Sequence, residues 1–372
     1  MSPRGQPPFR ADHVGSLLRP AALIEARARR AAGEIAAPEL RAVEDEAIRH
    51  AVELQEEAGL DGVTDGEYRR TFFHVDFLER IAGVRVTQGD YTVKFRGAKQ
   101  DVDFSPPVLS VQAKLARPAG GIARDDFIFL RETTTKTAKL CLPSPSMLHF
   151  RGGRGGVDAK AYPEIEDFFD DLARIYREEI ADLARAGLTY LQLDDTNLAY
   201  LCDPAHRARV QSIGEDPDQL PAIYARLISE SLRDRPPGMV ASIHLCRGNF
   251  RSSWVAEGGY DPVAEVLFNE TDVDAFFLEY DDARSGGFAP LRFVPADKMV
   301  VLGLVTTKDP TLEPKDDLKR RIDQAAKHVP LDNLCLSPQC GFSSTVHGNE
   351  LSEEQEIAKL RLVVETAREV WG

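Results

Sequence analysis

Strand-like and helix-like segments alternate along the whole chain, and this alternation constrains the fold more than any other feature. Short apolar runs rich in β-branched residues are each followed by a segment with helical periodicity. We expect strands at residues 11–16, 62–67, 138–142, 189–194, 239–246, 275–280, 299–306 and 334–340. We expect helices at residues 21–30, 38–58, 165–186, 219–233, 263–268, 315–328 and 352–371. This α/β pattern predicts a single (β/α)8 TIM barrel over residues 1–372, because parallel strands need helical crossovers.

A longer excursion separates the second and third predicted strands, at about residues 84–137. Residues 91–95 within it alternate in polarity, residues 127–130 form a short apolar run, and both segments are rich in β-branched or aromatic residues. This pattern predicts a β-hairpin inserted on one rim of the barrel, where it forms a lid or an extra wall.

The composition argues against several classes of partner. A net charge of −14 disfavours nucleic acid, since phosphate binding needs clustered Lys and Arg. The longest apolar run, residues 299–305, is too short to span a membrane, and residues 1–8 lack the apolar core of a signal peptide. An odd number of cysteines, five, fits a reducing compartment. We therefore expect a cytoplasmic protein with no nucleic-acid or membrane partner.

Polar and sulfur-bearing residues gather at the carboxyl ends of the predicted strands, where barrel enzymes place their active sites. His244 and Cys246 end the fifth strand two positions apart, so both side chains point to one face. Glu279 ends the sixth strand, and Cys340 ends the eighth. One imidazole, two thiolates and one carboxylate suit tetrahedral zinc, and sulfur disfavours magnesium and calcium. These four residues are therefore candidate Zn²⁺ ligands.

Other cysteines and Glu279 itself have simpler interpretations. Cys141, Cys202 and Cys335 are expected to be small apolar core residues. Glu279 taken alone is also compatible with an ordinary strand-end carboxylate paired with an arginine.

The same residues resemble a known family. His244 and Cys246, Glu279 within Phe-Leu-Glu-Tyr, and Cys340 within Pro-Gln-Cys-Gly match the zinc ligands of the cobalamin-independent methionine synthases. Three further segments, Gly15-Ser16, Asp65-Gly-Glu67 and Gln192-Leu-Asp194, look like the substrate-side motifs of that family. The resemblance runs from about Asp12 to the C-terminus.

The resemblance implies a zinc-dependent methyltransferase that moves a methyl group to a thiol, with homocysteine as the expected acceptor and methionine as the product. It implies a (β/α)8 catalytic barrel, and places Asp194 and Glu67 near the ammonium group of the thiol substrate. Ser16 is expected to contact the substrate carboxylate. A zinc-bound thiol is deprotonated near neutral pH, and the thiolate is the nucleophile in an alkyl transfer.

Two departures from the family pattern affect the donor half of the reaction. Full-length members carry an additional N-terminal barrel that helps to hold a polyglutamylated folate, whereas this chain matches the catalytic barrel. Where the family has a histidine in the loop after the seventh strand, this chain has Lys308. Lys308 is expected to assist the leaving group or to bind an anionic group. A folate and a methylated corrinoid both remain possible methyl donors.

Three other functions remain open at this point. A zinc enzyme that alkylates coenzyme M with an epoxide would use the same metal chemistry, but Glu67 and Asp194 suit its sulfonated thiol poorly. A metal-free decarboxylase of the uroporphyrinogen type is a second alternative, and a non-catalytic thiol-binding or corrinoid-protein-binding module is a third.

Three histidines near the predicted mouth also have open roles. His13 is a candidate substrate contact or a hydrogen-bonded core residue, with neither favoured. His74 is a candidate acid or base, although packing at a helix start beneath the inserted hairpin is favoured. His347 is expected to face solvent.

Overall fold

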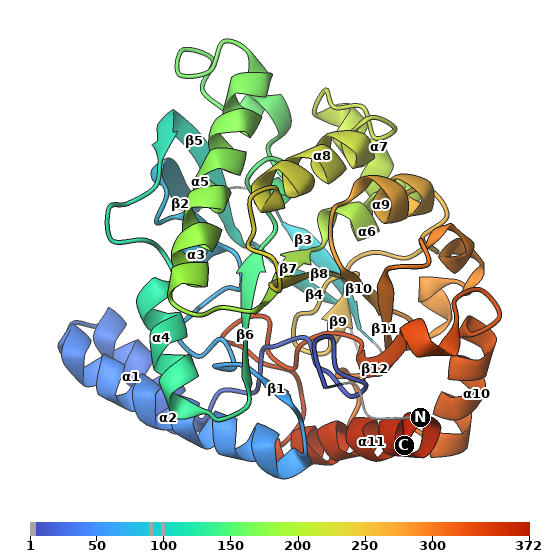
Figure 1. Cartoon of the computed structure of the whole chain (residues 1–372). Coiled ribbons are helices and arrows are strands. Elements are labelled where there is room, and N and C mark those ends of the chain that lie inside the picture. Colours follow the sequence, from blue (N-terminus) through green and yellow to red (C-terminus); the bar gives the residue numbers. More distant parts are fainter. Residues whose placement is uncertain (1–4, 89–91, 98–100) are drawn as a thin grey trace.

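The computed structural model describes residues 5–88, 92–97 and 101–372, and within them a curled parallel sheet forms the centre of the protein (Figure 1). The sheet has seven strands in the order β1-β6-β7-β8-β10-β11-β12. Their bounds are β1 Gly62–Val63, β6 Thr137–Pro143, β7 Tyr190–Asp195, β8 Val240–Leu245, β10 Ala275–Glu279, β11 Met299–Val305 and β12 Leu334–Pro338. Every residue of β11 is buried, as expected for a parallel strand covered on both faces. The seven barrel strands predicted from residue 62 onward are thus confirmed in type, with β1 shorter than expected.

The segment predicted as the first strand contributes a single bridge. Ala11 pairs in parallel with Leu336, and the Asp12 backbone N–H donates to the Leu336 carbonyl over 3.0 Å. On its other side, the Thr64 hydroxyl donates to the Gly15 carbonyl over 2.6 Å. The segment therefore lies beside both edge strands of the curled sheet, β12 and β1.

A buried ion pair fixes this segment inside the sheet. Lys139 Nζ lies 3.0 Å from Asp12 Oδ1, and both side chains are 0% exposed. The Tyr190 hydroxyl donates to the other Asp12 oxygen over 2.7 Å, and Lys139 also donates to the His13 carbonyl over 2.5 Å. Strands β6 and β7 are thereby tied to the N-terminal segment through side chains.

All seven predicted helices are present and cover the outer face of the sheet (Figure 1). They are α1 Ala21–Ala31, α2 Ala37–Ala58, α5 Ile165–Arg185, α8 Leu220–Leu232, α9 Ala264–Glu270, α10 Lys315–Ala325 and α11 Glu353–Trp371. Four further helices were not predicted: α3 Val75–Leu78, α4 Arg124–Thr133, α6 Asn197–Tyr200 and α7 Pro204–Ser212. Helix α11 begins at a capping box, in which the Ser352 hydroxyl accepts from the Gln355 N–H, and it packs against α2.

The inserted β-hairpin is not confirmed in the form predicted. The excursion contains β2 Ala82–Gln88, β3 Val93–Gly97, β4 Val102–Phe104 and β5 Pro107–Ala116. β2 pairs with β5, whereas β3 pairs with β4 and with β9, Ser253–Trp254. Residue 91 lies outside the described residues.

Residues 127–130 belong to helix α4 and not to a strand. Phe127 and Leu130 are three positions apart and both buried, which is the spacing of one helix face. Four consecutive apolar residues carry too little periodicity to separate the two structures, so the strand assignment was wrong.

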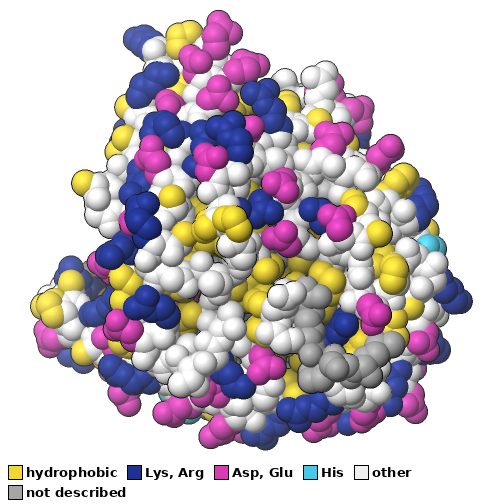
Figure 2. Space-filling view, viewed as in Figure 1, with side chains coloured by type: hydrophobic (Ala, Val, Ile, Leu, Met, Phe, Trp, Pro, Cys, Tyr) yellow, Lys and Arg dark blue, Asp and Glu magenta, His cyan; other side chains and the backbone are white. Residues whose placement is uncertain are grey.

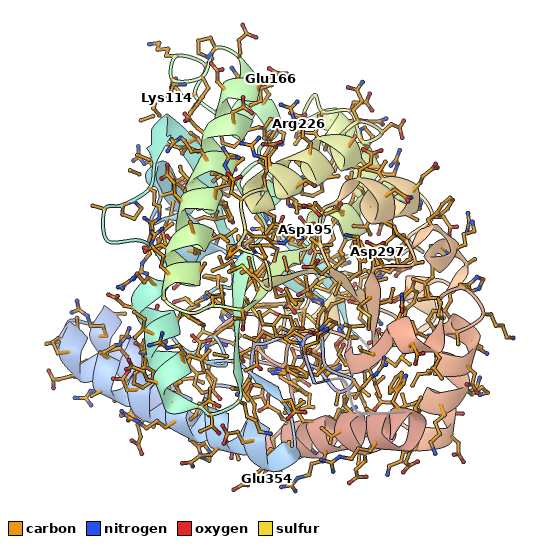
Figure 3. All side chains as sticks on the ribbon, viewed as in Figure 1. Lys114, Glu166, Asp195, Arg226, Asp297 and Glu354 are labelled. Carbon is orange, nitrogen blue, oxygen red and sulfur yellow. The ribbon has the colours of Figure 1, made fainter. Side chains whose placement is uncertain are left out.

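The face of the molecule shown in Figure 2 is mixed in charge, with acidic and basic side chains interspersed. Glu166, Arg226 and Glu354 lie on the outside, whereas Asp195 lies inside near the sheet, where it is fully buried (Figure 3). Among the described residues, no helix combines the length and apolar character that crossing a membrane requires.

Candidate metal and substrate site

A cavity of about 980 Å³, including its open mouth, lies at the carboxyl ends of the strands. Its polar lining includes Ser16, Glu67, Asp194, His244, Cys246 and Cys340. These residues come from strand ends that are far apart in sequence, and the curl of the parallel sheet brings them together.

Three of the four predicted metal ligands form a compact buried group. The candidate ligand atoms of His244, Cys246 and Cys340 all lie within 4.8 Å of one another. Neither ring nitrogen of His244 has a hydrogen-bond partner among the described residues, although the side chain is buried. Neighbouring Cys246 and His244 lower the pKa of Cys340 well below its usual value, although burial opposes the shift. An unpartnered imidazole beside two thiols is a donor set that fits Zn²⁺.

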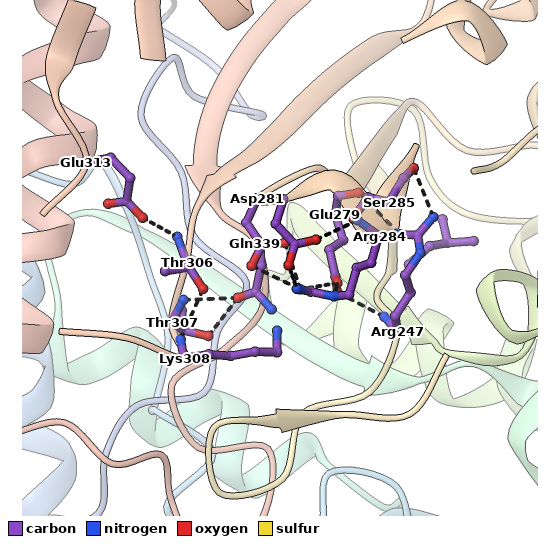
Figure 4. Close-up of polar contacts among 12 residues, drawn as sticks. Arg247, Glu279, Asp281, Arg284, Ser285, Thr306, Thr307, Lys308, Glu313 and Gln339 are labelled. Atoms are coloured by element: carbon purple, nitrogen blue, oxygen red, sulfur yellow. Dashed lines mark hydrogen bonds and ion pairs between the residues drawn. The ribbon is translucent and has the colours of Figure 1, made fainter. Parts of the chain in front are cut away.

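Glu279 does not belong to this compact group; its carboxylate is held by arginines (Figure 4). Oε1 accepts from Arg284 Nη2 over 2.8 Å, and Oε2 accepts from the Arg247 backbone N–H over 2.9 Å. Burial alone would raise the pKa of Glu279, but the charges of Lys308 and Arg284 outweigh it and lower the pKa to about 2. Glu279 is therefore an ionised carboxylate beside the group of His244, Cys246 and Cys340. Its pairing with Arg284 is the one expected of an ordinary strand-end carboxylate.

Glu67 and Asp194 form a second buried group beside the first. Their carboxylate oxygens lie within 4.8 Å of each other and of the Cys141 thiol. Burial, together with the charge of Asp194, raises the pKa of Glu67 to about 8, while Arg70 opposes the shift. Burial raises the pKa of Asp194 to about 6, and Gln192 Nε2 donates to its Oδ1 over 2.7 Å. Two close carboxyl groups with raised pKa values are poised to accept a cationic group.

The backbone holds Glu67 in an unusual conformation. Its φ is +60°, in the left-handed region that side-chain-bearing residues seldom adopt. The Glu67 N–H donates to Asp65 Oδ1 over 2.9 Å, and its carbonyl accepts from Arg19 Nη2 over 2.9 Å. Such locally costly conformations persist where neighbouring groups enforce them, and they are common at functional sites.

The two N-terminal candidates are placed differently. Ser16 lines the cavity, and its hydroxyl lies so close to Gly341 that a Cβ there would be only 1.9 Å from Ser16 Oγ. The His13 ring is not part of the lining, because it points to the Gly62 carbonyl at 3.2 Å. Burial and the charge of Lys139 lower the pKa of His13 to about 4, so its imidazole is neutral.

Lys308 lines a neighbouring cavity, together with Trp254, Asp281 and Arg284. Its Nζ is buried and makes no hydrogen bond to any described residue. In Figure 4 its side chain extends toward the Glu279–Arg284 group. Its positive charge lowers the pKa of both Glu279 and Cys340, so Lys308 favours the ionised forms of these two candidate ligands.

Part of the lining is aromatic, and the residues at the strand ends do not reveal it. Phe95 and Phe104 come from β3 and β4, and Phe250 follows the Cys246 segment. The Phe104 and Phe250 rings stack with centroids 4.3 Å apart, and Phe95 lies 5.1 Å from Phe250. The alternation of buried Val93 and Phe95 in β3 was the available signal, but it did not reveal which wall these side chains would join.

The fold and site together define an α/β barrel-like protein with candidate metal and substrate groups at the carboxyl ends of its strands. The chain belongs to the cobalamin-independent synthase family, since the family's catalytic-domain model matches residues 9–369.

Several relatives are similar over nearly the whole chain. "Uncharacterized protein YxjH" from Bacillus subtilis is 47% identical over 369 residues, which cover 98% of this chain and 95% of the relative. A solved structure from Listeria monocytogenes, described as a putative vitamin-B12 independent methionine synthase, is 38% identical with a TM-score of 0.79. It covers 99% of this chain and 100% of its own.

More distant relatives carry more explicit names. A B12-independent methionine synthase from Shewanella, solved in complex with selenomethionine, has a TM-score of 0.70 at 20% identity and covers 97% of both chains, which supports the fold. A 5-methyltetrahydropteroyltriglutamate–homocysteine methyltransferase from Bacillus velezensis is 23% identical. The match covers 86% of this chain but only 37% of that longer protein.

Proposed function

We propose that this protein is a zinc-dependent methyltransferase that transfers a methyl group to the thiol of homocysteine and so forms methionine. The observation that carries the proposal is the adjacency of two buried groups: a His–Cys–Cys cluster, and the carboxylate pair of Glu67 and Asp194. One suits a thiol-binding metal, and the other suits the ammonium group of an amino acid. Family membership and the names of the distant relatives support the same reaction.

In this proposal His244, Cys246 and Cys340 hold Zn²⁺, and Glu279 completes the ligand set by exchanging its contact with Arg284. When bound, zinc lowers the pKa of a thiol ligand so that the thiolate is present near neutral pH. Lys308 and Arg284 keep Glu279 ionised, and therefore available as a ligand.

The protein's own side chains orient the thiol substrate. Glu67 and Asp194 accept charge-assisted hydrogen bonds from the ammonium group, whose positive charge favours the ionised form of both. Ser16 contacts the substrate carboxylate. Lys308, which lines the neighbouring cavity with Trp254 and Arg284, stabilises negative charge on the leaving group. His13 takes no part in this scheme, because its ring faces the Gly62 carbonyl.

The proposal extends to fold and location. The segment at Ala11 takes the position of the eighth strand and so completes a (β/α)8 barrel. Its contacts with β12 and with the residue after β1 support this assignment. A cytoplasmic location is supported by five free, buried cysteines.

The two rival enzymes are less well matched to the site. A coenzyme M alkyltransferase must bind a sulfonate, which Glu67 and Asp194 would repel. A metal-free decarboxylase of the uroporphyrinogen type does not need a cluster of two thiols and an imidazole.

The test is a metal analysis followed by a donor screen. We expect about one equivalent of zinc in the purified protein. We also expect methionine formation from homocysteine with at least one of 5-methyltetrahydrofolate mono- and polyglutamates, methylcobalamin or small methylated compounds. A zinc-containing protein inactive with every donor would contradict the methionine synthase assignment. Tighter binding of coenzyme M than of homocysteine would contradict the assigned acceptor.

A further inference from the structure

The thiol half of the reaction does not use the whole cavity. Beyond the polar groups already described, the lining includes six phenylalanines, Phe72, Phe73, Phe95, Phe104, Phe150 and Phe250. Phe72 lies 6.1 Å from Phe104, which in turn stacks on Phe250. Strands β3 and β4 supply part of this aromatic wall, and β3 is pinned to the segment after β8 by pairing with β9. A ring-shaped or apolar group is the natural ligand of such a wall.

His74 also lines the cavity and is not used by the thiol half of the reaction. It occupies the N-cap position of α3, is 3% exposed, and contacts the Phe73 ring with centroids 4.6 Å apart. Neither Nδ1 nor Nε2 has a hydrogen-bond partner among the described residues. A buried polar group without a partner costs free energy, so a cavity-lining imidazole in this state points to a ligand that supplies the partners.

The charge state of His74 limits what that ligand can be. Burial and the positive charge of Arg151, which lines the same cavity, hold the pKa of His74 well below its usual value. The imidazole is therefore neutral, with one nitrogen that donates and one that accepts. It can pair with the edge of an uncharged group such as a cyclic amide. It does not offer the negative charge that would favour a sulfonium or a quaternary ammonium.

We propose that His74 binds the methyl donor and helps to select it. The donor would be a flat, uncharged ring system that lies on the Phe104–Phe250 wall and turns an amide-like edge to His74. This inference rests on the proposed function for the existence of a second substrate. The thiol substrate needs no contact with His74, because Glu67, Asp194 and Ser16 account for its ammonium and carboxylate groups.

The test measures binding, and it does not depend on turnover. The zinc-loaded protein is titrated calorimetrically with 5-methyltetrahydrofolate monoglutamate as the flat, amide-edged probe, and with homocysteine. His74→Phe removes both nitrogens but keeps an aromatic ring, whereas His74→Gln retains one donor and one acceptor. His149→Gln is the matched control, because His149 is equally buried, lies outside the cavity lining, and has a partner 2.9 Å away in the Tyr224 hydroxyl.

We expect His74→Phe to weaken binding of the flat probe at least tenfold, an effect typical of one lost hydrogen bond at a buried site. His74→Gln should stay within about threefold of the unmodified protein, and homocysteine affinity should change in none of the variants. Phe104→Leu, which does not touch His74, should also weaken the flat probe alone. This second variant keeps the test valid if His74→Phe does not fold.

Two results would overturn the inference: equal binding of the flat probe by the unmodified protein and His74→Phe, or no binding of that probe by the unmodified protein. Failure of the proposed function is distinguished from these results, because it appears as absence of methionine formation and not as a change in probe affinity.

Discussion

Asp194 and His244 are register partners on the parallel strands β7 and β8. The candidate ammonium-binding carboxylate and a candidate zinc ligand are thus held next to each other by the backbone ladder of the sheet. A substrate that carries a thiol and an ammonium group on one short chain can reach both. This relationship supports the proposal that one small amino acid occupies both groups.

Cys340→Ser should remove zinc from the protein. The hydroxyl is a much poorer zinc ligand than the thiolate, and only two members of the compact His–Cys–Cys group would remain. Metal content is measured by mass spectrometry after dialysis against a chelator. Cys335→Ser is the matched control, because Cys335 is also buried but belongs to an apolar cluster inside the sheet. Equal zinc content in both variants would contradict the assignment.

Glu279→Gln should weaken zinc retention less than Cys340→Ser does. The amide keeps one oxygen but loses the charge, while the His–Cys–Cys group stays intact. Competition with a chromogenic chelator measures the difference. Asp281→Asn is the control, since Asp281 also pairs with Arg284, at 2.8 Å, but is not a proposed ligand. If Glu279→Gln retains zinc as well as Asp281→Asn, Glu279 serves only to hold the arginines.

Asp194→Asn should raise the KM for homocysteine roughly 10- to 100-fold, which corresponds to one lost charge-assisted hydrogen bond. Steady-state kinetics measure this change. A thiol of similar length without an ammonium group, such as 4-mercaptobutyrate, should bind the variant no more weakly than it binds the unmodified protein. A parallel loss for both thiols would indicate general damage to the cavity.

The free energy of unfolding should depend on pH in a way that reflects the titration of Glu67. Burial raises its pKa from 4.5 to about 8, so between these values the folded protein binds a proton more tightly than the unfolded chain does. The free energy of unfolding should therefore contain a contribution that is full below about pH 4.5, falls as pH rises, and is lost above about pH 8. Urea unfolding across this range should show a shallower decline for Glu67→Gln. An unchanged pH profile would argue against the raised pKa.

Lys139→Met should destabilise the fold by about 3–5 kcal/mol, because it leaves the buried Asp12 carboxylate without its cation. The matched control is Lys136→Met, whose ion pair with Asp61 is largely exposed and should cost less than about 1 kcal/mol. Urea unfolding compares the two. The double variant Asp12→Asn, Lys139→Met should recover part of the loss, and equal costs for the two single variants would refute the structural role of the pair.

The sequence by itself determined the local elements. Helical periodicity located seven helices, and apolar runs located the seven strands of the central sheet, because these signals depend on spacing within one segment. It also determined that His244, Cys246 and Cys340 would meet, since strand ends converge at one side of a parallel sheet.

Only the tertiary structure decided which neighbours those side chains would have. Glu279 pairs with Arg284, Lys308 lines a neighbouring cavity, and His74 has no hydrogen-bond partner among the residues that the structure describes. Phe127 and Leu130 joined a helix because burial of one face outweighed a short strand-like pattern. Such outcomes depend on contacts between segments distant in sequence. A local sequence pattern does not reveal which charged or aromatic side chain another segment will place next to a given residue.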